Sequence, residues 1–269
     1  MPRRLGQHFL ADRHLLDRLV DALGARPDDV VIEIGAGTGT LTEALLARGL
    51  RVVAIEKDRE LARECGMRNA ECGMAQRCLV VEGDALTLDW HRVVNSAFRI
   101  PHSTFCVAGN LPYYITTPLI DKALTPPLPA RIVFLVQKEV ADRITAAPGS
   151  RTYGALSVGV QASCRAERLF VVPPGAFRPP PKVSSAALRL TPLERPLVPP
   201  GDAAAFRRFV TACFGRRRKQ LRNVLAGVTG SPPPVVAAGL QHLGIDPTAR
   251  PETLPPADFV RALRWTQDL

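Results

Sequence analysis

The 269-residue sequence lacks any apolar run that approaches the roughly eighteen consecutive residues that a transmembrane helix needs. Its first residues, MPRRLGQHFLADRH, are basic, but they contain no apolar segment of the kind found in secretory signals. From these two absences we expect a cytoplasmic protein without a membrane partner.

The sequence also lacks cysteine pairs of the C-x-x-C type, and no cysteine has a histidine nearby at metal-ligand spacing. Without a secretion signal, cysteines are expected to stay reduced. We therefore expect thiols that pack in the interior, without disulfide bonds and without a bound metal ion. The six residues are Cys65, Cys72, Cys78, Cys106, Cys164 and Cys213.

Lysine is scarce, because only Lys57, Lys122, Lys138, Lys182 and Lys219 are lysines among the 35 basic residues. Arginine therefore supplies most of the formal net charge of +10. Arginine pairs bidentately with phosphate and stacks on bases, which favours a polyanionic partner such as nucleic acid. Codon bias in a GC-rich genome would raise the arginine content equally well, so composition leaves both interpretations open.

Short apolar runs alternate with segments of helical spacing over the first two-thirds of the chain. Strands are expected at 30–34, 51–55, 78–81, 105–108, 131–136 and 183–190. Helices are expected at 12–23 behind an Asp12 cap, at 40–48, from about 58 onwards and at 116–124. This alternation predicts an α/β fold of Rossmann-like type, with a mostly parallel sheet covered by helices on both faces.

The sequence changes character after the stretch FRPPPKV (177–183), which its prolines keep extended. Residues 191–202 have the composition of a linker, and helices are expected beyond it at 203–214, 216–226, 235–243 and 257–265. We place a boundary near residue 193. It divides the chain into a sheet domain of residues 1–193 and a small all-helical domain of residues 194–269.

A glycine-rich loop, EIGAGTG (33–39), joins the first expected strand to the helix that follows. Glycines let a ligand approach the main chain closely, and the start of a helix offers unpaired N–H groups to an anionic group. The dinucleotide fingerprint G-x-G-x-x-G requires glycine where this chain has Thr40, so the spacing disfavours a nicotinamide cofactor. We expect Gly35 and Gly37 to contact a different nucleoside cofactor.

Two carboxylates follow the next two strands. Glu56 can accept hydrogen bonds from both hydroxyls of a ribose, which is a device that NAD and S-adenosylmethionine enzymes share. Asp84 can bind the N6 amine of the cofactor's adenine. Both carboxylates lie outside the carboxyl ends of their strands, where open α/β sheets bind ligands. Together they indicate an adenosine-containing cofactor.

The tetrapeptide Asn110-Leu111-Pro112-Tyr113 follows the fourth strand. The N6 amine of adenine is a poor nucleophile, because its lone pair is delocalised into the ring. The side-chain oxygen of Asn110 and the carbonyl of Leu111 can accept its two N–H groups and localise that lone pair for attack on a methyl group. Pro112 stiffens the turn, and Tyr113 can stack on the base. We expect all four residues to be catalytic, with Tyr113 also contacting the substrate.

Eight segments, in order and nearly from end to end, resemble the ribosomal RNA adenine N6,N6-dimethyltransferases. This family includes bacterial small-subunit enzymes and eukaryotic dimethyladenosine transferases. The segments are GQHFL (6–10), VIEIGAGTGTLT (31–42), AIEKD (54–58), EGDAL (82–86), GNLPYYITTPLI (109–120), FLVQKEVADRI (134–144), TYGALSV (152–158) and FRPPPKVSSAALRL (177–190).

The resemblance implies an enzyme that uses S-adenosylmethionine, without a metal, to dimethylate the N6 amine of adjacent adenines in 16S ribosomal RNA. The implied fold is a Rossmann-like methyltransferase sheet followed by a small helical domain. The implied partner is ribosomal RNA within a small-subunit precursor particle, which gives the protein a role in small-subunit biogenesis. We expect it to act as a monomer.

The resemblance also implies roles for individual residues. The family's cofactor contacts fall on His8, Leu10, Gly35, Glu56, Asp84 and Asn110. Tyr113 matches the aromatic residue that stacks on the target base, and Phe177 matches the aromatic residue that closes its other face. His8 stands where many relatives have Asn, and Tyr114 stands where Asn is usual.

Four consecutive cations, Arg216, Arg217, Arg218 and Lys219, stand at the start of the helix expected at 216–226. Cations there oppose the helix dipole, so we expect them to contact RNA phosphates instead of stabilising the helix. A solvated surface without a partner is the alternative.

Three other functions remain open at this stage. The large-subunit (23S) adenine methyltransferases of the macrolide-resistance type share a similar tetrapeptide, but they usually have NIPY where this chain has NLPY. A nicotinamide-linked oxidoreductase is disfavoured by the spacing of the glycines. A non-catalytic RNA-binding assembly factor is disfavoured because Glu56, Asp84 and Asn110 are all present.

Overall fold

The computed structural model describes residues 8–71, 73–98 and 105–268, so Gly6, Gln7 and Cys72 lie outside the described residues. The chain forms two compact units. The first comprises Met1–Ala141 and Glu167–Thr191, and the second comprises Asp142–Ala166 and Pro192–Leu269. The second unit thus includes a segment that lies before the boundary expected near residue 193. The division into domains of residues 1–193 and 194–269 stays a prediction.

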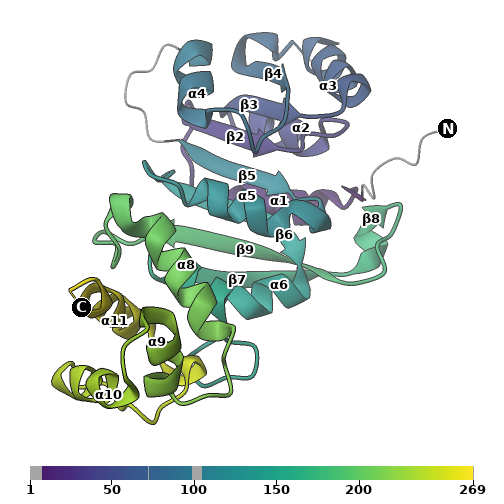
Figure 1. The fold of residues 1–269 in the computed structure, drawn as a ribbon. Coiled ribbons are helices and arrows are strands. Elements are labelled where there is room, and N and C mark those ends of the chain that lie inside the picture. The colour runs from purple at the N-terminus through teal and green to yellow at the C-terminus, as the bar shows by residue number, and fades with distance from the viewer. Residues whose placement is uncertain (1–7, 72, 99–104, 269) are drawn as a thin grey trace. The chain divides into compact units, whose positions relative to one another are not determined.

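The first unit is built around a seven-stranded sheet with the strand order β4-β3-β2-β5-β6-β9-β7 (Figure 1). The strands are β2 (Val30–Ile34), β3 (Arg51–Glu56), β4 (Cys78–Glu82), β5 (Cys106–Asn110), β6 (Arg131–Gln137), β7 (Cys164–Val172) and β9 (Ser185–Pro192). Strands β4, β3, β2, β5 and β6 are parallel, and β9 runs antiparallel to β6. The prediction of a mostly parallel, Rossmann-like sheet is confirmed.

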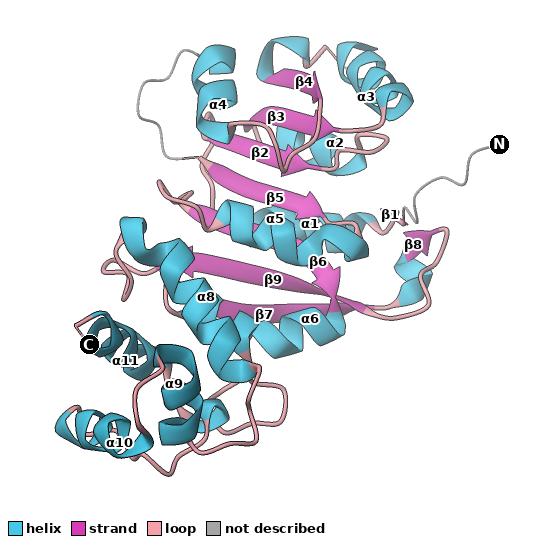
Figure 2. Cartoon of the chain, in the orientation of Figure 1, coloured by secondary structure: helices cyan, strands magenta, loops and turns pink. Residues whose placement is uncertain are grey.

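Helices cover both faces of this sheet. They are α1 (Arg13–Asp21), α2 (Thr40–Ala47), α3 (Arg59–Glu71), α4 (Trp90–Phe98), α5 (Thr116–Ala123) and α6 (Lys138–Ile144). Buried side chains of α1, α2 and α3 share one hydrophobic cluster with alternate residues of the strands. Figure 2 shows α4 and α5 in front of the strands, on the other face. Burial on both faces explains why the central strands are continuous apolar runs.

The first helix begins where the sequence predicts. Asp12 is its N-cap, and the side chain accepts a hydrogen bond from the backbone N–H of Leu15 at 3.1 Å. The buried residues of α1 recur at helical spacing and join the core. No helix in the described part of the chain is long and apolar enough to cross a membrane.

A second, two-stranded sheet brings the start of the chain to the proline-rich stretch. Strand β1 (Phe9–Leu10) pairs antiparallel with β8 (Phe177–Arg178), and Leu10 faces Phe177 in this register. Both side chains are buried in the hydrophobic cluster under α1 and α2. This pairing fixes the backbone on either side of it, which includes His8.

The second unit is helical, and its own core holds it together. Its helices are α7 (Ala155–Gln161), α8 (Ala203–Phe214), α9 (Leu221–Thr229), α10 (Pro233–His242) and α11 (Pro256–Gln267). Tyr153 is fully buried, lies edge-on to Phe214, and donates a hydrogen bond from its hydroxyl to the carbonyl of Leu254 at 2.9 Å. These contacts explain why residues 142–166 belong with the C-terminal helices.

Residues 191–202, which were expected to be a linker, lead from the end of β9 to the start of α8. Within them, Leu193 and Leu197 donate backbone hydrogen bonds to Ser163 and Ala162, each at 2.9 Å. One detail of the C-terminal prediction is wrong. The helix expected at 216–226 begins only at Leu221, after a turn that holds the four cations. Four successive cations would destabilise the first turn of a helix, because their charges oppose the helix dipole.

Candidate active site

A cavity of about 510 Å³ opens at the carboxyl ends of the parallel strands. Its volume lies in the range of small-molecule sites, about 300–1,000 Å³. Most of the residues predicted from the sequence for the cofactor and the reaction line it, namely His8, Gly35, Gly37, Glu56, Asp84, Asn110, Leu111, Pro112 and Tyr113. They come from the ends of four neighbouring strands and from the segment before β1, so the sheet order brings distant parts of the sequence together.

The glycine loop forms one wall of the cavity and has little room for side chains. Gly35 and Gly37 have φ values of +74° and +55°, in the left-handed region that favours glycine. A Cβ atom on Gly37 would lie 2.6 Å from the ring of Phe9. The N–H of Gly35 continues the pairing between β2 and β3, because it donates to the carbonyl of Ile55 at 2.9 Å.

Glu56 is buried beside this loop, with 5% of its surface exposed. Its Oε2 accepts a hydrogen bond from the N–H of Gly37 at 2.8 Å, and its Oε1 accepts one from the N–H of Asp58 at 2.9 Å. Two backbone donors thus hold the carboxylate in a fixed orientation. Each of its oxygens keeps a further lone pair for a ligand.

Asp84 lines the neighbouring part of the cavity and forms an ion pair with Lys57. The ammonium Nζ of Lys57 lies 2.9 Å from Oδ2 of Asp84, while Oδ1 accepts a hydrogen bond from the N–H of Leu86 at 2.9 Å. These contacts, with Lys57 first, lower the pKa of the Asp84 carboxyl below its ordinary value. Asp84 is therefore a pure hydrogen-bond acceptor at neutral pH. Lys57 was not predicted from the sequence to be a site residue.

A third carboxyl group, that of Glu33, lies beneath the loop and was not predicted from the sequence as a separate feature. It is 1% exposed, and the hydroxyl of Thr42 donates to its Oε2 at 2.5 Å. Burial is the main cause that raises the pKa of Glu33 to about 8; the charge of Glu56 contributes to the rise, and the hydrogen bond from Thr42 opposes it. The bond to Thr42 joins β2 to α2 across the glycine loop. The signal in the sequence was an acidic residue inside the apolar run VVIEI (30–34).

The loop after β5 carries the residues predicted to be catalytic. The Nδ2 atom of Asn110 lies 2.6 Å from the carbonyl oxygen of His8. A carbonyl can only accept hydrogen bonds, so the amide nitrogen must face it, and Oδ1 of Asn110 is left as an acceptor. The N–H of Leu111 donates to the carbonyl of Leu135 at 3.0 Å, which ties the loop to β6.

Tyr113 and His8 lie side by side at the edge of this loop. Their ring centroids are 5.9 Å apart, with 32° between the ring planes. Nδ1 of His8 donates a hydrogen bond to the carbonyl of Pro179 at 2.8 Å. The hydroxyl of Tyr113 lies 2.8 Å from the hydroxyl of Ser185, a residue that the sequence analysis did not single out. Tyr114 is 63% exposed and lines the same cavity.

Among the residues predicted to contact the cofactor or the target base, Leu10 and Phe177 do not line the main cavity. Phe177 is fully buried in the core, and it does not line the cavity. Its pairing with Leu10 across β1 and β8 gives the ring a packing role, so a contact with the target base stays a prediction. Leu10 lines a separate, small cavity that also touches Gly35 and Asn110.

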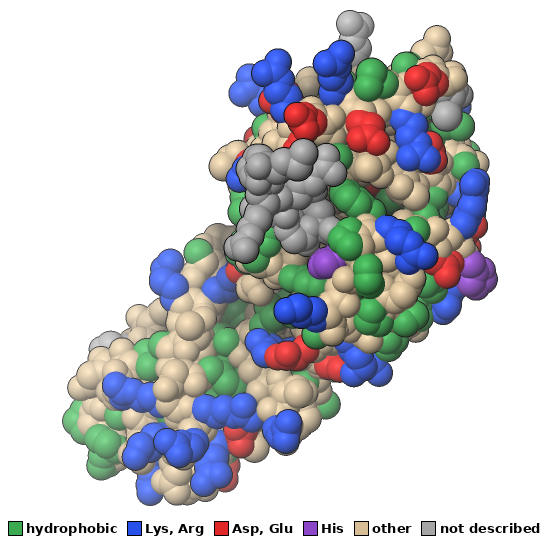
Figure 3. All heavy atoms as spheres, turned by 90° about the vertical axis from the view of Figure 1, so that its right-hand side faces the viewer, with side chains coloured by type: hydrophobic (Ala, Val, Ile, Leu, Met, Phe, Trp, Pro, Cys, Tyr) green, Lys and Arg blue, Asp and Glu red, His purple; other side chains and the backbone are tan. Residues whose placement is uncertain are grey.

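The four predicted RNA-binding cations belong to the second unit and differ from one another. Arg217 pairs with Glu252 and donates to the carbonyl of Arg151 at 3.0 Å. The guanidinium of Arg216 lies against Gly227 of α9. Arg218 and Lys219 are exposed and make no ion pair within the described part of the chain. In Figure 3, most of the charged side chains in view on the lower part of the surface, which the C-terminal helices form, are Lys and Arg.

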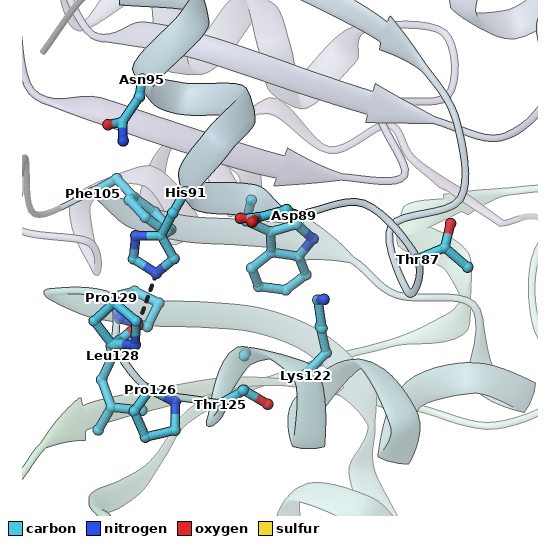
Figure 4. A pocket seen from close by; sticks show the side chains of 13 residues that line it. Thr87, Asp89, His91, Asn95, Phe105, Lys122, Thr125, Pro126, Leu128 and Pro129 are labelled. Atoms are coloured by element: carbon cyan, nitrogen blue, oxygen red, sulfur yellow. Dashed lines mark hydrogen bonds between the residues drawn. The ribbon is translucent and has the colours of Figure 1, made fainter. Parts of the chain in front are cut away.

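A larger cavity of about 650 Å³ lies elsewhere in the first unit, between α4 and the turn at 125–129 (Figure 4). None of the predicted site residues lines it. Nε2 of His91 donates a hydrogen bond to the carbonyl of Pro127 at 2.9 Å, so the ring holds the turn (dashed line in Figure 4). The smaller cavity, where the predicted residues converge, is the better candidate site. Among the described residues, no group of three His, Cys, Asp or Glu side chains could hold a metal ion.

Comparisons with known proteins show which family the sequence matches. The family model described as "Ribosomal RNA adenine dimethylase" matches residues 2–268. A curated relative from Xanthomonas campestris pv. campestris strain B100, named ribosomal RNA small subunit methyltransferase A, is 43% identical over 260 residues, which cover 96% of this chain and 94% of the relative. A relative of the same name from Pseudomonas aeruginosa is 42% identical over 268 residues, which cover 99% and 95%.

Two solved structures are also similar over nearly the whole chain. A dimethyladenosine transferase from Plasmodium falciparum aligns with a TM-score of 0.80 and 28% identity, covering 95% of this chain and 96% of that one. The 23S rRNA methyltransferase ErmE aligns with a TM-score of 0.72 and 26% identity, covering 96% and 99%.

We predict that Glu33→Gln makes the stability of the chain less dependent on pH. The pKa of Glu33 is higher in the folded chain than in the unfolded chain, so its stabilising contribution is present at low pH and is lost as the pH rises through about 8. Between pH 6 and pH 8 this loss amounts to about 2 kcal/mol. Glutamine cannot ionise and keeps the acceptor for Thr42.

Urea unfolding of both proteins at pH 6 and pH 8 measures the effect. The free energy of unfolding should fall more steeply for the wild type than for the variant. Parallel pH dependence in the two proteins would show that Glu33 does not change its charge in this range.

Proposed function

Because the chain belongs to the ribosomal RNA adenine dimethylase family, we propose that it transfers methyl groups from S-adenosylmethionine to the N6 amine of adenine in ribosomal RNA. The family resemblance predicted from the motifs is confirmed by the match over residues 2–268. In finer detail, we propose two transfers to each of two adjacent adenines in 16S ribosomal RNA, within a precursor of the small subunit. We further propose a cytoplasmic monomer that needs no metal ion.

The small-subunit assignment is supported by the names of the two curated relatives described above. Proteins named ribosomal RNA small subunit methyltransferase A are 42–43% identical to this chain, whereas the 23S enzyme ErmE is 26% identical. A 23S methyltransferase of the macrolide-resistance type therefore remains the second candidate. The cavity with its free acceptor atoms also disfavours a non-catalytic assembly factor.

The residues of the cavity fit the cofactor's adenosine. The buried carboxylate of Glu56 is held by two backbone donors and keeps lone pairs for the two ribose hydroxyls. Asp84 is ionised and can accept the N6 amine of the cofactor's adenine. Gly35 and Gly37 line the cavity without side chains, so a ligand can approach the main chain closely there. When bound, S-adenosylmethionine supplies an electrophilic methyl carbon on a sulfonium centre.

The observation that carries the proposal is the orientation of the Asn110 amide. Its nitrogen faces the carbonyl of His8, so Oδ1 is available as an acceptor. Neither Oδ1 of Asn110 nor the carbonyl of Leu111 accepts a hydrogen bond from any residue in the described ranges. Two free acceptors in one turn suit the two N–H groups of an amine. They would draw its hydrogens and localise the nitrogen lone pair toward the methyl carbon.

The remaining requirements concern the base. Tyr113 lies at the cavity with its ring fixed at the hydroxyl end, so it can stack on the target adenine. A base that reacts in this way must leave its stack and enter the cavity. No strong base is needed for the proton, because the amine becomes acidic once it is alkylated. The basic turn of the second unit supplies charges for the RNA backbone.

We predict that Asn110→Ala slows methyl transfer by about a hundredfold or more, because the variant loses one preorganised acceptor for the amine. Binding of RNA should change little, since the contact is made to a single atom of the target base. The assay uses labelled S-adenosylmethionine with unmethylated small and large ribosomal subunits, followed by mapping of the modified nucleoside.

The wild type should label the small subunit and yield N6,N6-dimethyladenosine. Label in the large subunit alone would favour the 23S assignment. An Asn110→Ala variant as fast as the wild type would contradict the proposed chemistry.

We predict that Arg218→Gln with Lys219→Gln weakens RNA binding and lowers its salt dependence. Loss of two phosphate contacts should reduce the slope of log Kd against log salt concentration by up to about two. Arg63→Gln is the matched control, because Arg63 is an exposed arginine on α3 of the first unit. Affinity measured from low to moderate salt distinguishes them. A change no larger than that of the control would mean that Arg218 and Lys219 form a solvated surface.

A further inference from the structure

Ser185 is a buried serine whose hydroxyl needs a hydrogen-bond partner. It is the first residue of β9, is fully buried, and lies 2.8 Å from the hydroxyl of Tyr113 through its own Oγ. No other hydrogen bond of this hydroxyl is seen in the described part of the chain. A buried hydroxyl without a partner is costly, so the two hydroxyls satisfy each other.

The sheet holds Ser185 in place. Ser185 pairs in register with Gln137 of β6, and the neighbouring carbonyl of Ser184 accepts the N–H of Lys138 at 3.0 Å. The backbone of Ser185 therefore moves only if the edge between β6 and β9 moves. A side chain that forms a hydrogen bond with Ser185 is therefore held by the sheet of the first unit.

Tyr113 and Ser185 come from opposite sides of β6 in the sheet. Tyr113 follows β5, and β5 is separated from β9 by β6 in the sheet order. The backbone of Tyr113 lies in a single turn of 3-10 helix (Tyr113–Ile115), in which the N–H of Ile115 donates to the carbonyl of Pro112 at 3.2 Å. One short turn orients a ring poorly by itself. The bond at the hydroxyl fixes the far end of the ring.

We propose that Ser185 is a positioning residue for methyl transfer, and that it acts by holding the ring of Tyr113 at the angle at which the target adenine stacks. This inference rests on the proposed function, and it adds a residue from β9 to the reaction. The orientation of a stacked base sets the line between its amine and the methyl carbon, and small misalignments reduce rates strongly.

A double-mutant cycle under saturating RNA and cofactor tests the proposal. Ser185→Ala and Tyr113→Phe each remove one hydroxyl and keep the ring. We expect each to lower kcat about tenfold, since misplacement by a fraction of an ångström suffices for such a loss, with KM for RNA changed less than about twofold. Because both changes delete the same bond, the double variant should be no slower than the slower single variant.

Ser184→Ala is the matched control. Ser184 is the adjacent serine, and its contact with Lys138 is made by the backbone carbonyl, which the substitution keeps. Its kcat should stay that of the wild type. If Ser185→Ala slowed the reaction by the same factor in the wild type and in Tyr113→Phe, the proposal would be overturned, because the residue would then act through the fold and not through Tyr113.

A second measurement does not depend on activity. Burial raises the pKa of the Tyr113 phenol, and the hydrogen bond with Ser185 opposes that rise. Ser185→Ala should therefore raise the pKa further in an NMR titration of a chain with ring-labelled tyrosine. An unchanged pKa would contradict the positioning role itself, whereas a wild-type chain that transfers no methyl group would contradict the proposed function.

Discussion

The hydrogen bond from the side-chain amide of Asn110 to the carbonyl of His8 is the constraint on which the site depends. It spans 2.6 Å and joins residues 102 positions apart in the chain. It decides which atom of the amide faces the cavity, and so whether Asn110 offers an acceptor or a donor to a substrate. The carbonyl of His8 is in place because β1 pairs with β8, and because the His8 ring donates to Pro179. The chemistry of one side chain thus follows from the pairing of two short strands.

The rest of the site is a consequence of the parallel sheet. Strands that run in one direction end at one edge, so the polar residue that follows each strand reaches the same cavity. Glu56, Asp84 and Asn110 therefore line one cavity. In the proposed function, the two carboxylates bind the cofactor's adenosine and Asn110 accepts a hydrogen bond from the amine. Backbone donors and Lys57 hold the two carboxylates, while β6 and β9 hold the loop after β5. The site is therefore largely preorganised, which is the condition for electrostatic stabilisation of a reacting amine.

Much of this arrangement could be predicted from the sequence, because the polar residues at the strand ends of the site follow apolar runs that predict strands. What could not be predicted depends on partners distant in the sequence. Ser185 stands in an ordinary serine pair, and only the sheet order brings it to Tyr113. Strand β7 escaped prediction because Arg165, Glu167 and Arg168 interrupt its apolar pattern, as is usual for a strand at the edge of a sheet. Phe177 resembled a substrate contact in its motif, yet its pairing with Leu10 buries it in the core.

The proposed chemistry depends on the direction of the hydrogen bond between Asn110 and His8, and Asn110→Asp tests that direction most directly. Aspartate supplies acceptor oxygens of the same geometry, but it has no N–H to donate, so its carboxylate is repelled by the carbonyl of His8 and loses the orienting contact. The measurement is the single-turnover rate of methyl transfer to unmethylated small ribosomal subunits at neutral pH. The account predicts a rate for Asn110→Asp about a hundredfold or more below that of the wild type. A rate equal to that of the wild type would show that the donor to His8 is dispensable, and would contradict the central claim.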